Sequence, residues 1–91
     1  MDSIHLEIRG RVQGVGFRWF VVDKARELRL KGWVRNKPDG NVEIAAAGER
    51  DALAQLEIAV AKGPPGARVE QVQKLAPTAL ESLESPFGIA R

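Results

Sequence analysis

Cysteine is absent from this chain of 91 residues, and histidine occurs once, as His5. The lack of cysteine excludes disulfide bonds, thiolate metal sites and every mechanism that uses a cysteine nucleophile. A single histidine excludes metal sites that need several imidazole ligands. We therefore expect no bound metal ion, and any catalysis must rely on other side chains or on the backbone.

Long apolar runs are also missing: none approaches the ~20 residues that a membrane-spanning helix needs. The start of the chain, Met1-Asp2-Ser3, lacks the basic and apolar regions of a signal peptide. These features predict a soluble, cytoplasmic protein without a membrane partner. Lys and Arg number 14 against 12 Asp and Glu, a net charge of +2. Non-specific nucleic-acid binders usually concentrate more basic charge than this.

What the chain does contain is ordinary globular composition, with 44% apolar and 29% charged residues, and length for a single domain over residues 1–91. Apolar residues alternate with polar ones in some segments and recur at helical spacing in others. Gly, Pro and Asp clusters separate these segments. The pattern predicts strands over residues 4–8, 33–37, 42–46, 68–75 and 87–89, and helices over 17–28 and 49–62.

The order β-α-β-β-α-β with a short tail favours a ferredoxin-like α+β sandwich, in which a mostly antiparallel sheet carries two helices on one face. Imperfect alternation over 68–75 indicates a β-bulge, and residues 77–85 fit either a loop or a short helical turn. Since crossover connections join parallel strands, the first two strands end at the same edge of the sheet. The glycine-rich segment after the first strand should therefore lie beside Asn36, near the end of the second.

That segment, Gly10 to Arg18, joins a strand to a helix and can be interpreted in two ways. Its glycines could simply permit a tight turn. Alternatively, Gly14 and Gly16 could let the backbone approach a ligand, with successive N–H groups and the positive end of the helix dipole binding an anion. Arg18 favours the second interpretation, because an arginine in a first helical turn costs about 0.3–1 kcal/mol unless an anion is bound there.

Two motifs together, GRVQGVGFR at residues 10–18 and GWVRN at 32–36, resemble the acylphosphatase family. A Pro-Asp-Gly turn and a GPPGARV segment add to the resemblance, which runs from about Ile4 to Val72. It implies a ferredoxin-like fold that hydrolyses small-molecule acyl phosphates to carboxylate and inorganic phosphate. The family does so without a metal, a cofactor or a covalent intermediate.

Carried over by position, the resemblance assigns Arg18 to the phosphoryl group and Asn36 to the attacking water. It assigns phosphate binding to the whole loop, namely Gln13, Gly14, Val15, Gly16, Phe17 and Arg18. The chain departs from the family at Arg29, where a glycine is general. If the helix ends there in a left-handed conformation, the arginine costs roughly 1–2 kcal/mol of stability.

Two other functions stay open at this stage. A non-catalytic module that binds acyl or carbamoyl phosphate would have the same loop, although the presence of both Arg18 and Asn36 favours an enzyme. An RNA-binding domain of ferredoxin-like fold would place aromatic residues on the open face of its sheet. Only 5% of this chain is aromatic, which makes that alternative weaker. His5 is expected to be an ordinary surface residue, and the chain to be a monomer.

Overall fold

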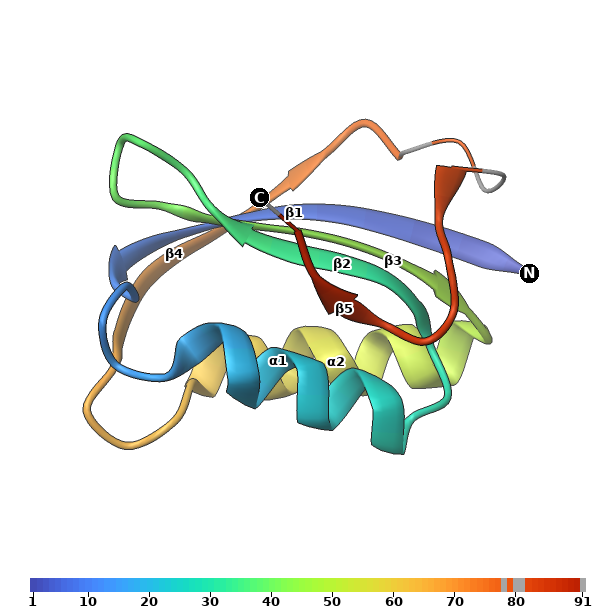
Figure 1. The fold of residues 1–91 in the computed structure, drawn as a ribbon, viewed down its shortest axis with the longest axis horizontal. Coiled ribbons are helices and arrows are strands. Elements are labelled where there is room, and N and C mark those ends of the chain that lie inside the picture. Colours follow the sequence, from blue (N-terminus) through green and yellow to red (C-terminus); the bar gives the residue numbers. More distant parts are fainter. Residues whose placement is uncertain (78, 80–81, 91) are drawn as a thin grey trace.

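Both helices lie on one face of a five-stranded sheet (Figure 1), in a computed structural model that describes residues 1–91 except 78, 80, 81 and 91. The elements in chain order are β1 (Asp2–Arg11), α1 (Phe17–Glu27), β2 (Lys31–Asn36), β3 (Val42–Gly48), α2 (Arg50–Lys62), β4 (Arg68–Leu75) and β5 (Gly88–Ile89). Each helix and strand predicted from periodicity is present.

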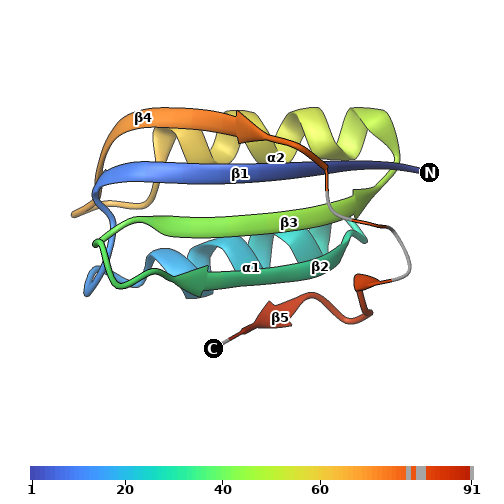
Figure 2. The same ribbon diagram turned by 90° about the horizontal axis from the view of Figure 1, so that it is seen from above.

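The strand order is β4-β1-β3-β2-β5, which Figure 2 shows from above. Strand β3 is antiparallel to both β1 and β2, so β1 and β2 run parallel and end at the same edge of the sheet. The two-residue strand β5 pairs in parallel with β2. The ferredoxin-like prediction is confirmed, and the closing edge strand is formed.

The main core fills the space between the sheet and the two helices. Leu6 and Ile8 of β1 are fully buried there, as the alternation predicted, together with Phe17 at the start of α1 and Phe87 just before β5. Because Phe87 contributes a large buried ring, the short C-terminal strand is anchored by its flanking side chain rather than by its length.

The end of β1 departs from the prediction, since Gly10 and Arg11 still belong to the strand. The pairing of β1 with β4 shifts between Arg9 and Gly10, which leaves Glu70 as the extra residue of a bulge. Gly10 has a φ of 131°, and a Cβ there would collide with the carbonyl oxygen of Arg68. A glycine can therefore continue the strand at a point where any other residue would break the pairing.

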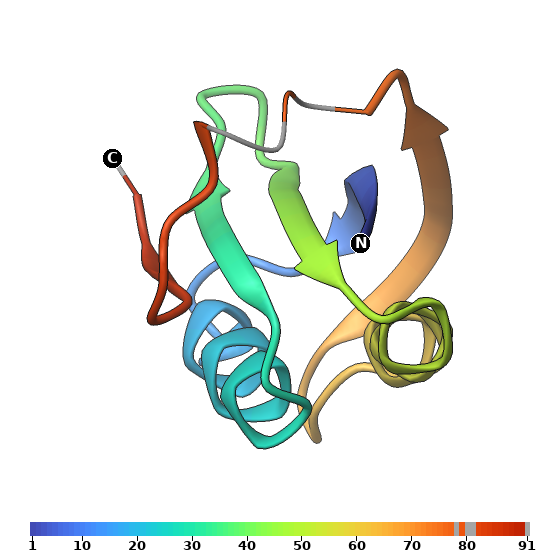
Figure 3. The same ribbon diagram turned by 90° about the vertical axis from the view of Figure 1, so that its right-hand side faces the viewer.

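Strand β3 is buried on both faces of the sheet, whereas its alternating sequence pattern predicts burial on one face only. All seven residues of β3 are buried, including Glu43, Ala45 and Ala47, which face away from the helices. The segment after β4 crosses this face, as the end view in Figure 3 shows, and Leu83 packs on the two alanines. The open question over residues 77–85 falls partly outside the described residues.

His5 is not an ordinary surface residue, which corrects the prediction. Its side chain is 17% exposed, with Nε2 on the Glu43 carboxylate and Nδ1 3.2 Å from the carbonyl oxygen of Ala76. Its ring also lies edge-on to Trp33 of β2, and local alternation does not reveal such long-range contacts. Within the described ranges, no helix has the length and apolar character needed to span a membrane.

Arg29 adopts the left-handed conformation anticipated for it, with a φ of 58°. The N–H of Arg29 donates to the carbonyl of Arg26, and the N–H of Leu30 donates to that of Ala25. These two bonds form a Schellman motif, which usually carries glycine at this position. The arginine is therefore accommodated at the cost of backbone strain.

Candidate active site

The loop between β1 and α1 is shaped by two glycines with positive φ, Gly14 at 74° and Gly16 at 77°. A Cβ placed on either would meet no described atom within 4 Å. These glycines are thus required by the backbone conformation, and close packing against the protein does not explain them. The open space beside them leaves the loop accessible to a ligand, which supports the anion-binding interpretation over a simple packing turn.

Gly16 is the N-cap of α1, and this end of the helix has no side-chain capping group. No side chain donates or accepts at this cap, and no acidic residue occupies the first turn. The first N–H groups of a helix lack intrahelical partners and carry the positive end of the dipole. Among the residues that the structure describes, nothing negative offsets that charge, so the loop and the start of α1 form a favourable place for an anion.

Arg18 lies in this first turn and is half-buried. No ion pair or hydrogen bond of its guanidinium is found within the described parts of the chain. Val15 and Phe17, in contrast, direct their side chains into the core, where Phe17 is 1% exposed. Of the predicted loop residues, these two can therefore offer only backbone groups to a phosphate, whereas Arg18 can offer its side chain.

Asn36, the last residue of β2, is the other predicted site residue. It shares the helix-facing side of β2 with the fully buried Val34, because side chains two residues apart lie on the same face of a strand. Its Oδ1 is buried and has no hydrogen-bond partner among the described residues. Such an atom costs about 1–3 kcal/mol when unpaired, which makes Asn36 an unusual residue for a purely structural role.

Gln13 connects the loop to the hairpin that contains Asn36. Its side-chain Nε2 donates to the carbonyl oxygens of Lys37 at 2.8 Å and Asn41 at 2.9 Å. The predicted closeness of the loop to the end of β2 is thus confirmed. Sequence reasoning treated Gln13 as part of the phosphate loop, however, and the structure commits its side chain to the hairpin turn, which we define as residues 37–41.

Glu7 holds the same turn from the middle of β1, and sequence reasoning did not select it. Its Oε2 accepts from Lys37 Nζ at 3.0 Å and from Asn41 Nδ2 at 2.7 Å, and its side chain is 15% exposed. The hydrogen bond from Asn41, followed by that from Lys37, lowers the pKa of Glu7 below its ordinary value. The available signal was an acidic residue on the outer face of a strand paired with a hairpin.

Glu43 lies directly opposite Glu7 on β3. Burial acts to raise the pKa of Glu43, but hydrogen bonds from His5 and from Arg35 Nε at 2.7 Å outweigh it, and the pKa is lowered. Each of the two neighbouring carboxylates therefore has its own cation, which relieves the repulsion between like charges across strands.

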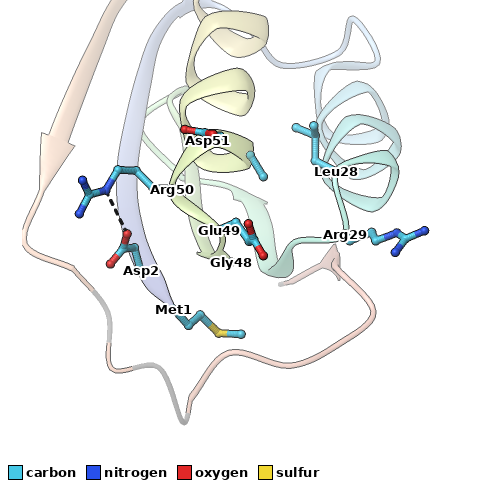
Figure 4. A pocket seen from close by; sticks show the side chains of 9 residues that line it. Met1, Asp2, Leu28, Arg29, Gly48, Glu49, Arg50 and Asp51 are labelled. Carbon is cyan, nitrogen blue, oxygen red and sulfur yellow. Dashed lines mark hydrogen bonds and ion pairs between the residues drawn. The ribbon is translucent and has the colours of Figure 1, made fainter.

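Two open hollows, of about 670 and 740 Å³, lie at the opposite end of the molecule. Figure 4 shows the first, lined by the start of β1, the end of α1 and the start of α2, with an ion pair between Asp2 and Arg50. Neither hollow includes the loop or Asn36. The described residues contain no cluster of potential metal ligands.

The open glycine loop, the uncapped N-terminus of α1 with Arg18 in its first turn, and the buried amide of Asn36 at the neighbouring strand end together form the candidate site. The acylphosphatase family model matches residues 4–89. An acylphosphatase from Koribacter versatilis is 53% identical over 66 residues, which span 72% of this chain and 60% of that relative. The aligned segment is thus less than two thirds of the relative's length.

Solved structures show similarity over the whole chain. The acylphosphatase from Bacillus subtilis has a TM-score of 0.90 and 39% identity, with 98% of each chain covered. HypF from T. kodakarensis has a TM-score of 0.80 and 30% identity, with 100% of this chain but 12% of that chain covered. The chain belongs to the acylphosphatase family.

Proposed function

We propose that the chain hydrolyses acyl phosphates by direct attack of a water molecule on a phosphoryl group bound by residues 13–18. The backbone N–H groups of Gln13 to Arg18 and the Arg18 guanidinium bind the phosphoryl oxygens. Asn36 Oδ1 accepts a hydrogen bond from the attacking water. The observation that carries this proposal is the buried, unpartnered Oδ1 of Asn36 at the strand end adjoining the open loop.

The chemistry requires little more than these groups. The water oxygen forms a bond to phosphorus while the bond between phosphorus and the acyl oxygen breaks, and the carboxylate leaves with the electron pair. Because a carboxylate is a weak base, no strong general acid is needed, and the proton of the water passes to a phosphate oxygen. Phosphoryl transfer depends mainly on positioning and on charge stabilisation, which N–H groups and an arginine supply.

Two variants test the separate roles. Arg18→Ala removes a charged group that contacts phosphate before and during the reaction, so phosphate binding and turnover of benzoyl phosphate should both fall. Asn36→Ala should lose about 10²-fold in turnover and bind phosphate almost as well as the parent, because Asn36 carries no charge. Phosphate affinity follows from the rise in melting temperature in phosphate against matched chloride, a stabilisation of about 2.7 kcal/mol at a hundredfold excess over Kd.

Three outcomes would contradict these assignments. If Asn36→Ala binds phosphate as poorly as Arg18→Ala, Asn36 is a phosphate ligand. If Asn36→Ala turns over normally, it does not hold the water. If the parent binds phosphate but hydrolyses no acyl phosphate, the chain is a binding module.

Other expectations remain proposals alongside this mechanism: a single domain over residues 1–91, a monomer, a cytoplasmic location, no metal or cofactor, and no nucleic-acid partner. Against RNA binding, Leu83 packs on the outer face of the sheet beside Trp33, where RNA-binding domains of this fold keep aromatic rings open. Sedimentation measures the oligomeric state, and a gel shift at low salt measures RNA binding.

A further inference from the structure

Within the described residues no hydrogen bond holds Asn36 Oδ1 in place, so the position of this amide depends on the backbone that carries it. The backbone on either side must therefore determine its position relative to the loop. On one side Asn36 pairs with Val42 of β3. On the other it is followed at once by Lys37, the first residue of the hairpin turn. Movement of this turn would move Asn36 with it.

We infer that Gln13 is a positioning residue for hydrolysis, whose side-chain amide locks the hairpin turn, and with it Asn36, in register with the phosphate-binding loop. This inference rests on the proposed role of Asn36. The amide has two N–H bonds, and each donates to one carbonyl oxygen at the mouth of the turn, those of Lys37 and Asn41. A side chain used in this way has no donor left for a phosphate.

These two carbonyl oxygens also accept the backbone hydrogen bonds that close the turn. Lys37 N–H donates to the Asn41 carbonyl at 2.8 Å, and Gly40 N–H donates to the Lys37 carbonyl at 3.1 Å. Gln13 therefore binds to the part of the turn that is internally most constrained. A shift of the loop along the strand direction would break both amide bonds together, so the pair opposes sliding as well as separation.

Glu7 supports the same arrangement from the outer face of the sheet. It accepts from the side chains of Lys37 and Asn41, the two residues whose carbonyls Gln13 contacts. The turn is consequently attached to β1 through Glu7 and to the segment after β1 through Gln13. Since β1 leads directly into the phosphate-binding loop, both attachments hold Asn36 in a fixed position relative to that loop.

The experiment uses the full chain with Gln13→Met, which preserves side-chain length and removes both donors. Gln55→Met on α2 is the control, because Gln55 is an exposed glutamine remote from the loop. With benzoyl phosphate as substrate, Gln13→Met should lower kcat about tenfold or more, as misplacement of a reacting group commonly does. The KM and the inhibition constant of inorganic phosphate should stay within about twofold of the parent, and Gln55→Met should match the parent throughout.

A double-mutant cycle with Asn36→Ala shows whether Gln13 acts through Asn36. Once Asn36 is removed, Gln13→Met should lower kcat no further. Multiplicative losses in the cycle, an unchanged kcat in Gln13→Met, or a phosphate inhibition constant that rises along with the loss of kcat would each overturn the inference. If Asn36→Ala alone turns over normally, the failure belongs to the proposed function, and the two failures are distinguishable.

Discussion

At position 29 glycine should give a more stable chain than alanine, because Arg29 is the described non-glycine residue held at positive φ. A left-handed conformation costs an L-residue with a Cβ roughly 1–2 kcal/mol, and glycine avoids this cost. Glycine also gains about 0.5–1 kcal/mol of conformational entropy in the unfolded chain, which works against folding. The difference leaves a net stabilisation of roughly 0.5–1 kcal/mol from the backbone alone.

The arginine also carries a charge just beyond the end of α1, where a cation interacts favourably with the helix dipole by about 0.3–1 kcal/mol. Arg29→Ala removes this charge as well but retains the Cβ, so it is the matched control. Measured against Arg29→Ala, Arg29→Gly should unfold at a higher urea concentration. For a domain of this size, the melting temperature should be about 2–8 °C higher.

Urea unfolding followed by tryptophan fluorescence measures both variants, and benzoyl phosphate hydrolysis provides an independent readout. Arg29 is exposed and lies at the end of α1 remote from the loop, so hydrolysis should be unchanged in both. Equal unfolding midpoints for glycine and alanine would refute the strain, since only the Cβ distinguishes them. A fall in the rate of hydrolysis would show that a change at the end of α1 alters the phosphate loop at its start.

Acid should lower the free energy of unfolding through Glu7 and Glu43, because the pKa values of both are lower in the folded chain than the ordinary 4.5. The stabilisation from these carboxylates is present above pH 4.5 and is lost as the pH falls through their folded pKa values. Urea midpoints between pH 3 and 7 should therefore fall less steeply in Glu7→Gln, and an unchanged slope would count against this. Phe87→Ala should cost about 3–5 kcal/mol, because the ring is fully buried; a loss below ~1 kcal/mol in urea unfolding would show that β5 is peripheral. Benzoyl phosphate hydrolysis should persist in excess chelator, and loss of activity restored by a divalent ion would contradict a mechanism that uses only the loop, Arg18 and water.

The order of elements could be predicted from the sequence because it depends on local periodicity and on turn residues. Alternation over residues 4–8, helical spacing from Phe17 and the Pro-Asp-Gly turn each report on a few neighbouring positions. The parallel course of β1 and β2 then followed from the handedness and reach of crossover connections. The position of Asn36 near the glycine loop could therefore be predicted from the strand topology, without any side-chain contact.

The left-handed conformation of Arg29 was anticipated from the family resemblance, because a glycine is general at that position in the family. The ends of the strands were harder to predict from the sequence. Gly10 continues β1 because the bulge in β4 accommodates it, and a residue on one strand carries no local signal about an extra residue on its partner.

Only the tertiary structure decided which partners the polar side chains take. His5 was expected to be an ordinary surface residue, and the structure pairs it with Glu43, the carbonyl of Ala76 and the ring of Trp33. Gln13 was assigned to the phosphate-binding loop, and the structure adds that its side-chain amide binds the hairpin turn. Glu7 was not selected, because its only signal was an acidic residue on the outer face of a strand. A side chain in a strand chooses among partners that the register brings from distant parts of the chain, so its hydrogen bonds follow from long-range packing, which local sequence patterns do not encode.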